Sequence, residues 1–205
     1  MKRLVAGTTN RNKVHEIRAA LASLTCWTVE GLPAGAPDVE ETGLTFLENA
    51  IQKALHFSRY VDALTLADDS GLCIDALGGR PGIQSARYGS DPESRIDRVL
   101  REMKSVADEQ RTAKFLCALA LARAGNLIWT VEREAHGRIA RAPSGAHGFG
   151  YDPIFHLPEL GRTMAELTTD EKEKVSHRGR ALAELERFLG PSGIEAGTLK
   201  RGIPC

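Results

Sequence analysis

The chain is organised around the stretch Leu64-Thr65-Leu66-Ala67-Asp68-Asp69-Ser70-Gly71-Leu72-Cys73-Ile74. Two apolar, strand-like runs flank two adjacent carboxylates, a serine and a glycine. Carboxylates at a strand end suit a metal-assisted reaction, so we interpret this stretch as the centre of a candidate active site, with an acidic turn in solvent as the alternative. Successive strand side chains point to opposite faces, so we expect Asp68 and Ser70 on one side and Asp69 on the other.

The composition is that of an ordinary globular protein. The 205 residues are 42% hydrophobic and 26% charged, and 27 Lys plus Arg balance 27 Asp plus Glu. Without net charge there is no overall field to recruit nucleic acid, so a polyanion must be bound by local clusters of cations. No apolar run approaches the roughly 20 residues of a membrane span, and residues 4–7 are too short for a secretory signal. The four cysteines form no metal-binding motif, so we expect a cytoplasmic protein with reduced thiols.

Hydrophobic patterning predicts an α/β chain. Apolar residues recur at helical spacing in 14–24, in 46–55 after a capping Thr45, in 96–103 and in 181–189. The capping-box pair Thr168 and Glu171 predicts one further helix start. Strand-like runs occupy 4–7, 27–30, 64–67, 112–123 and 127–135, the last two joined as a hairpin at Gly125-Asn126.

The connecting segments are as informative as the elements. No linker or repeat divides the chain, so we predict a single domain over 1–190 and a loose tail over 191–205. The glycine-rich segment 77–83 is expected to have no helix or strand of its own. In the loop 143–153, two aromatic residues among glycines are either plugs into the core or platforms for a flat ligand. The polar loop Thr8–Lys13 lies between a strand and a helix start, where free N–H groups favour an anion.

Five polar segments have side chains that fit a nucleoside triphosphate. Cations and hydroxyls suit phosphates, carboxylates suit Mg²⁺, an aromatic ring suits a base and a His-Arg pair suits a base edge. The segments are 8–13, 40–42, 68–71, 148–152 and 172–178.

These segments closely resemble the HAM1/RdgB family of inosine and xanthosine triphosphate pyrophosphatases, which clear non-canonical purine nucleotides. The resemblance runs from residue 2 to about residue 189. No single motif is decisive, but six in order over one chain are highly specific. Thr9 departs from the family pattern, where glycine is frequent, and we expect an ordinary φ there. The motifs are T-x-N-x-x-K (8–13), EETGLTFLENA (40–50), ADDSGL (67–72), GGRPGIQSARY (78–88), GFGYDPIF (148–155) and SHRG (176–179).

The resemblance implies hydrolysis of ITP, dITP or XTP between the α and β phosphates, which gives a monophosphate and pyrophosphate. The implied fold is α/β, with an elongated, mixed and twisted central sheet, flanking helices and two lobes around a nucleotide-binding cleft. Members are typically homodimers. Their partners are small-molecule purine nucleoside triphosphates, so neither nucleic acid nor a membrane is expected.

Site roles follow from the same resemblance. Mg²⁺ is assigned to Asp69 with Glu40 or Glu41, a choice that the spacing leaves open, and Asp69 is also the candidate general base. Asp68 would lie behind it. Asp152 either meets the base, the interpretation we prefer, or locks its loop.

The remaining roles divide between phosphate, base and loop. The 8–13 loop, Lys53 and Ser70 would bind phosphate or sugar oxygens, Phe149 would stack on the base, and Lys172 with 177–178 would donate to a 6-oxo group. The substrate-binding residues are therefore Thr8, Thr9, Asn10, Arg11, Asn12, Lys13, Lys53, Ser70, Phe149, Gly150, Tyr151, Asp152, Lys172, His177 and Arg178.

Two other functions fit the sequence less well. A general phosphatase could use Asp68 or Asp69 as a nucleophile, but that chemistry usually needs an acid two residues on, where this chain has Ser70 or Gly71. A non-catalytic nucleotide sensor or an RNA-binding module is the other alternative. Neutral net charge argues against RNA, and an intact carboxylate set argues against a pure sensor.

Overall fold

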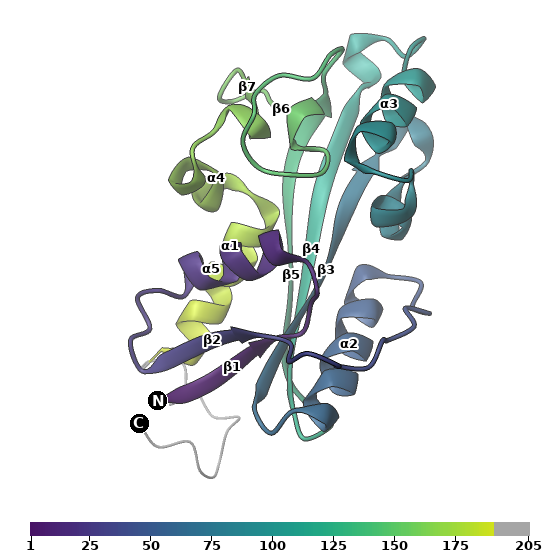
Figure 1. Ribbon diagram of the computed structural model, residues 1–205. Coiled ribbons are helices and arrows are strands. Elements are labelled where there is room, and N and C mark those ends of the chain that lie inside the picture. Colours follow the sequence, from purple (N-terminus) through teal and green to yellow (C-terminus); the bar gives the residue numbers. More distant parts are fainter. Residues whose placement is uncertain (191–205) are drawn as a thin grey trace.

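The computed structural model describes residues 1–190, so the tail that we predict for 191–205 lies outside the described residues. One seven-stranded sheet runs through them in the order β2-β1-β3-β4-β5-β6-β7 (Figure 1). β1 is parallel to both of its neighbours and the later pairs are antiparallel, so the sheet is mixed, as predicted. The strands are β1 (Lys2–Ala6), β2 (Trp27–Gly31), β3 (Leu64–Ile74), β4 (Thr112–Arg123), β5 (Asn126–Ile139), β6 (Phe155–Leu157) and β7 (Arg162–Thr163).

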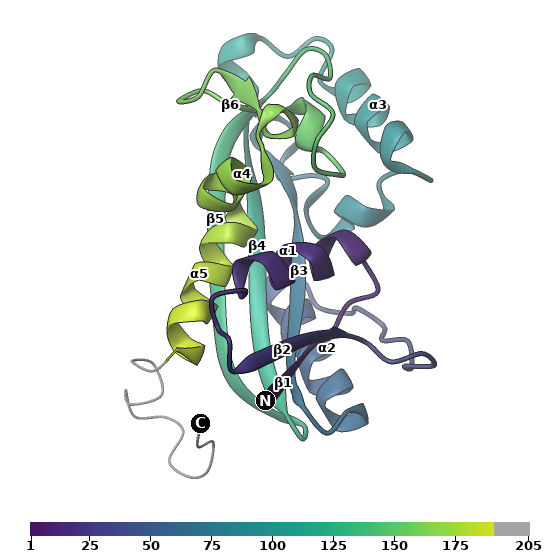
Figure 2. The same cartoon turned by 60° about the vertical axis from the view of Figure 1, so that its left-hand side comes forward.

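Helices cover both faces of the sheet. α1 and α5 pack on one face and α2 on the other (Figures 1 and 2). Thr45 caps α2 and Thr168 begins α4 with the capping box, as predicted. None of the helices within residues 1–190 has the length and apolar character needed to cross a membrane. The helices are α1 (Arg11–Ala20), α2 (Phe46–Tyr60), α3 (Pro92–Glu102), α4 (Thr169–Val175) and α5 (His177–Leu189).

The long strands β3, β4 and β5 join two lobes (Figure 1). The lower lobe holds β1, β2, α1, α2 and α5, and the upper lobe holds α3, β6 and β7. Two apolar clusters fill the lower lobe, one on each side of the sheet, and a third fills the upper lobe. On the α2 side, the sheet presents Ala118, Ala120 and Ala122 to Ala50 and Ala54, and these small side chains let the helix lie close to the strands.

The central stretch is one strand and not two strands around an acidic turn. β3 runs unbroken through both acids, with Asp68 opposite Leu119 and Asp69 opposite Ala118 of β4. The expectation of carboxylates at a strand end is therefore wrong, because partners from other elements offset both charges and let the ladder continue. The expected alternation is confirmed, since Ser70 Oγ donates to Asp68 while Asp69 faces α2.

Smaller differences concern turns. The segment predicted to lack structure over 77–83 contains the end of one 3₁₀ helix, Asp75–Leu77, and the start of another, Gly82–Arg87. The hairpin turns at Ala124-Gly125, with φ of 49° and 76°, one residue earlier than predicted. Ala124 is the only non-glycine within residues 1–190 with a positive φ, so Thr9 is ordinary, as expected.

Gly71 is needed where the Gly82–Arg87 helix docks on β3. A Cβ at Gly71 would lie 2.7 Å from the Gly82 carbonyl oxygen and closer still to Ser85 Oγ. We expect Gly71→Ala to lower the free energy of unfolding by about 1–3 kcal/mol through overpacking, as measured by urea denaturation. Gly31→Ala is the control, because a Cβ there meets nothing within 4 Å. Equal unfolding midpoints for the two variants would contradict this close packing.

Candidate active site

The site lies where β1 stops and β3 continues. β1 pairs with β3 only as far as Ala6 opposite Leu66, and the Gly7 N–H then donates to the Leu66 carbonyl at 2.6 Å. The next residues of β3 are the two acids. The chain leaving β1 therefore passes beside Asp68 and Asp69 before it enters α1, which brings the predicted phosphate loop to the carboxylates.

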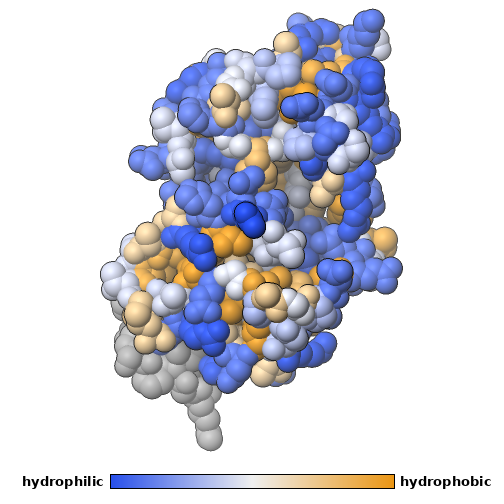
Figure 3. All heavy atoms as spheres, viewed as in Figure 1, coloured by the Kyte–Doolittle hydropathy of each residue, from blue (hydrophilic) through white to orange (hydrophobic). Residues whose placement is uncertain are grey.

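A cavity of about 460 Å³ opens between the lobes at this level. Figure 3 shows the surface hollowed there, with hydrophilic side chains over much of its rim. The cavity gathers predicted site residues from six separate segments. Those lining it are Thr8, Thr9, Asn10, Asn12, Lys13, Glu41, Lys53, Asp69, Ser70, Phe149, Gly150, Tyr151, Asp152, Lys172, His177 and Arg178.

Two predicted site residues do not line this cavity. Arg11 lies on a separate open groove beside β2. Glu40 is exposed, whereas its neighbour Glu41 is partly buried and faces the cavity. Of the two metal candidates that the sequence left open, the geometry therefore favours Glu41.

Asp68 is fully buried and paired with two cations. Arg178 Nε donates to its carboxylate at 3.0 Å, and Lys13 forms a second ion pair. Burial by itself raises the pKa of Asp68, but the Arg178 and Lys13 charges outweigh it and hold the pKa well below its usual value. Arg178 also donates to Ser70 Oγ at 2.6 Å, so that hydroxyl is already engaged within the protein.

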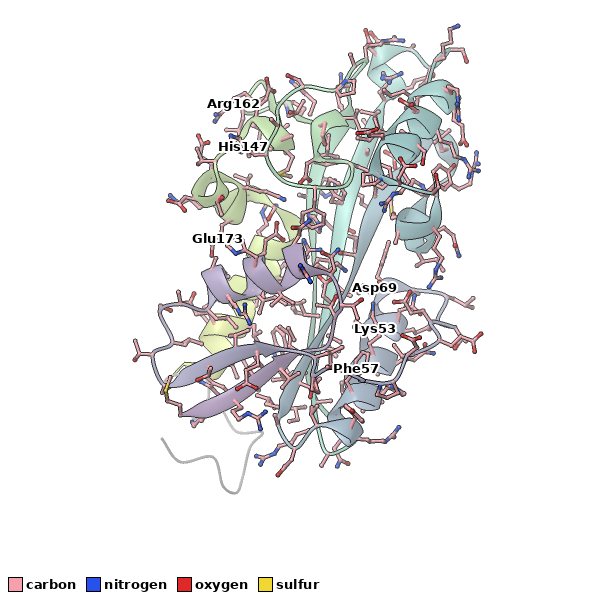
Figure 4. All side chains as sticks on the ribbon, viewed as in Figure 1. Lys53, Phe57, Asp69, His147, Arg162 and Glu173 are labelled. Atoms are coloured by element: carbon pink, nitrogen blue, oxygen red, sulfur yellow. The ribbon has the colours of Figure 1, made fainter. Side chains whose placement is uncertain are left out.

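Asp69 faces the cavity on the α2 side of the sheet. It accepts from Asn49 Nδ2 at 3.2 Å and from Lys53 Nζ at 3.0 Å, and Lys53 also donates to Glu41 at 2.8 Å. Figure 4 shows Lys53 and Asp69 close together beside the upper end of α2. Burial raises the pKa of Asp69, although the Lys53 and Lys13 charges oppose that rise. A carboxylate with a raised pKa is a stronger proton acceptor than an ordinary aspartate.

The donors around Asp69 fit a hard divalent cation. Glu41 and Asp69 meet the same ammonium nitrogen, so their oxygens converge on one place at the cavity wall. Within residues 1–190, no three His, Cys, Asp or Glu side chains gather as a protein-only metal site. One or two carboxylates completed by phosphate oxygens and water is the usual Mg²⁺ environment.

The phosphate loop is capped by its own side chain. Asn10 Oδ1 accepts from the N–H groups of Asn12 and Lys13 at 3.0 and 3.4 Å, and Thr8 Oγ1 accepts from the Asn10 N–H. These amides at the start of α1 therefore already have acceptors, contrary to the expectation that they would be free for phosphate. The loop still lines the cavity, except at Arg11.

The loop before β6 is locked by Asp152. Its carboxylate accepts from the Phe149 N–H and from Lys172 Nζ, both at 2.8 Å, and it is 3% exposed. These contacts are those of a loop lock, the interpretation that we placed second. Lys172 Nζ lies 4.8 Å and the Arg178 guanidinium 5.5 Å from the centre of the Phe149 ring. Cations therefore surround the ring expected to stack on a base.

The other two aromatic side chains predicted at the site pack inward. The His177 ring stacks on Phe115 at 4.7 Å, and burial with the Arg178 charge holds the pKa of His177 well below its usual value. The ring is neutral near pH 7, and its buried Nδ1 meets no partner within residues 1–190. Tyr151 is buried and donates to the Ser85 carbonyl at 2.9 Å, so it is a plug, while Phe149 is half-buried at the cavity.

A second, smaller cavity of about 180 Å³ adjoins the first at Phe149 and Lys172. Its wall includes Leu167 and Leu182 and is more apolar than polar. His147 and Glu173, which also line it, lie on the α4 side of the molecule in Figure 4. A flat ligand on Phe149 would therefore have apolar space next to buried cations.

Two functional side chains were missed from the sequence. Glu16 accepts from Lys172 at 2.9 Å and from Arg178 at 2.6 Å, so it orients both cations. Asn49 orients Asp69 while its oxygen accepts from the Gly43 N–H at 2.8 Å. Asn49 and Lys53 are 2% and 7% exposed, so both of these polar side chains of α2 are buried at the site.

The side chains around Phe149 and those around Asp69 together indicate the class of protein. Cations around a ring suit a base, and hydroxyls with ammonium groups beside carboxylates suit a phosphate chain with its metal. Both sets in one interlobe cavity belong to a nucleotide-binding α/β protein.

Comparison with known proteins makes the assignment specific. The model of the Ham1 family matches residues 4–188, and the chain belongs to this family. It is 49% identical to a dITP/XTP pyrophosphatase of Geobacillus kaustophilus, over 94% of this chain and 98% of the relative. The corresponding enzyme of Bacillus subtilis is 47% identical over 92% of this chain and 98% of its own.

Solved structures agree with this assignment. A HAM1 protein from Coxiella burnetii is 40% identical with a TM-score of 0.83, covering 92% of this chain and 98% of that one. A nucleoside-triphosphatase, or dITP/XTP pyrophosphatase, from Mycobacterium abscessus is 41% identical with a TM-score of 0.71, covering 90% and 97%. The predicted elongated α/β fold with a mixed sheet is therefore confirmed.

The Glu16 ion pairs predict a pH effect on stability. Burial raises the pKa of Glu16, but the Arg178 and Lys172 charges outweigh it and leave the pKa below the usual 4.5. A carboxyl with a depressed folded-state pKa stabilises the fold above its unfolded pKa, and that stabilisation is lost as the pH falls through the folded value. We expect Glu16→Gln to be less stable than wild type near pH 7, and the gap to narrow below about pH 4.5.

The measurement is urea unfolding of both proteins across this range. Glu132→Gln, at an exposed position of β5, is the control and should show no such change. A gap between wild type and Glu16→Gln that stayed constant or widened in acid would show that the Glu16 pairs do not contribute in this way.

Proposed function

We propose that this protein hydrolyses the non-canonical purine nucleotides ITP, dITP and XTP to the monophosphate and pyrophosphate. The observation that carries the proposal is the position of Asp69. It lies with Glu41 and Lys53 on one wall of a cavity that Phe149 and Lys172 also line. A nucleotide whose base stacks on the Phe149 ring would extend its phosphates towards the carboxylates of Asp69 and Glu41. The dITP/XTP pyrophosphatases among the relatives support this substrate class.

Asp69 is the proposed general base. Its oxygen would take the proton from a water that attacks the α phosphorus, with Asn49 and Lys53 holding the carboxylate in place. Glu41 and Asp69 would hold Mg²⁺, which would offset phosphate charge and act as a Lewis acid. Lys53 is positioned to stay near both carboxylates and to meet phosphate oxygens as well.

Recognition of the base falls to the cations around Phe149. Lys172 already donates to Glu16 and Asp152, which leaves one of its three N–H groups for a ligand. Arg178 makes three donations within the protein and retains two N–H groups. These donors suit the 6-oxo acceptor of hypoxanthine or xanthine and would face a donor amine in adenine. Buried donors left unpaired by the wrong base discriminate by about 10⁴-fold in favourable cases.

A homodimer and a cytoplasmic location are further parts of the proposal. Family resemblance is the support for the dimer. Cys26, Cys73 and Cys117 are free thiols, in keeping with a reducing compartment. Sedimentation analysis would test the oligomeric state directly.

The test of function is a comparison of ITP, dITP, XTP, GTP and ATP with Mg²⁺. We expect pyrophosphate as the product from the first three, and little turnover of ATP because its 6-amino group cannot accept from the buried cations. Product identity is measured by separate assays for pyrophosphate and orthophosphate. Orthophosphate alone would support a general phosphatase, and tight binding without turnover would support a nucleotide sensor.

Asp69→Asn tests the assignment of the base. We expect kcat for dITP to fall by roughly 10²–10⁴-fold, the usual contribution of a positioned base, while nucleotide binding is retained. Both are measured, by initial rates and by calorimetry. Asp62→Asn, at an exposed position, is the matched control. A near-normal kcat in Asp69→Asn would assign proton transfer to another group.

A further inference from the structure

The upper wall of the large cavity carries a cation that none of the six family-like motifs contains. Arg95 lies in the first turns of α3 and lines the cavity together with Pro92, Arg87 and Ala86. The predicted substrate-binding cations that line the cavity come instead from α1, α2, α4 and α5. Arg95 therefore reaches the cavity from a helix that carries none of the predicted substrate-binding residues.

The Arg95 side chain is held in place by backbone. Its Nε donates to the Asp91 carbonyl at 3.1 Å and its Nη1 to the Ala86 carbonyl at 3.3 Å. Its stem packs under the turn at Gly89, where an added Cβ would lie 3.0 Å from Arg95 Cγ. Two of the five guanidinium N–H groups are used, so three remain for a ligand in an orientation that is already fixed.

Charge balance distinguishes Arg95 from the other cations of the cavity. Six Lys or Arg side chains line it, and within residues 1–190 five of them form ion pairs with carboxylates. Arg95 donates to carbonyl groups and forms no ion pair there. A triphosphate brings about four negative charges. The other cations of the cavity are already paired with carboxylates, so Arg95 supplies a positive charge that no carboxylate offsets.

The position of Arg95 indicates which end of the ligand it meets. Ala86, whose carbonyl it contacts, directly precedes Arg87, and Arg87 Nη2 donates to Glu41 at 3.1 Å. Arg95 is therefore linked through the 86–87 backbone to Glu41 at the carboxylate end of the cavity, whereas Phe149 and Lys172 form the base end. A nucleotide stacked on Phe149, with its α phosphorus near Asp69, would have its β and γ phosphates beyond that point.

We propose that Arg95 binds the β and γ phosphates of the substrate and the pyrophosphate that leaves, so that the site selects triphosphates over monophosphates. This inference rests on the proposed function. The guanidinium would donate charge-assisted hydrogen bonds to the terminal phosphate oxygens and stabilise the departing pyrophosphate.

The experiment measures binding of inorganic pyrophosphate and of IMP by calorimetry, with Mg²⁺, in wild type, Arg95→Gln and Arg95→Lys. We expect Arg95→Gln to weaken pyrophosphate binding by roughly tenfold or more, as for the loss of a charged hydrogen-bond pair, and to leave IMP binding unchanged. KM for dITP should rise in parallel, and Arg95→Lys should recover part of both. Arg101→Gln, an exposed arginine of the same helix, is the control.

Three results would overturn the proposal. Unchanged pyrophosphate binding in Arg95→Gln would show that Arg95 does not contact the β and γ phosphates. Equal weakening of pyrophosphate binding and IMP binding in Arg95→Gln would show that Arg95 only holds the 86–91 turn in place. An effect of Arg101→Gln equal to that of Arg95→Gln would lead to the same conclusion. Wild-type turnover of dITP is measured first, so failure of the proposed function is seen separately, and the binding comparison does not depend on it.

Discussion

The buried charge of Asp68 is the constraint on which the arrangement depends. An isolated carboxylate inside a protein costs several kcal/mol, and the cost is offset only by close partners of opposite charge. Here the partners are Lys13, from the first turn of α1, and Arg178, from the first turn of α5. One carboxylate on the central strand thereby fixes two helix starts, and both carry residues that face the cavity.

Much of the fold follows from local patterns, because the strands and helices carry clear apolar periods and caps. The continuity of β3 does not. A run with two adjacent acids looks like a break when read alone, and only Lys13 and Arg178, far away in sequence, make Asp68 compatible with a buried ladder. The turn at Ala124-Gly125 was displaced by one residue because an alanine occupies a conformation that usually favours glycine or asparagine.

The site was predictable where residues belong to recognisable motifs, and less so where a helix face had to be assigned. The buried stripe of α2 runs through residues 46, 49, 50, 53, 54 and 57, so Asn49 and Lys53 lie in register with its apolar positions. That spacing was a usable signal that both are directed inward. The sequence carries no comparable signal for Glu16 or Arg95, because their partners come from other parts of the chain. The choice between Glu40 and Glu41 as the metal ligand likewise depends on the path of the loop before α2, which the sequence does not show.

The three long strands that join the lobes set the mechanics of the cleft. β3, β4 and β5 pass from one lobe to the other as a continuous hydrogen-bonded ribbon, with no loop interposed at the level of the cavity. Relative movement of the walls must then be taken up as torsion and bending distributed along this ribbon, not as rotation about a flexible joint. Residues midway along β4 and β5 thus govern the stiffness with which the cleft opens.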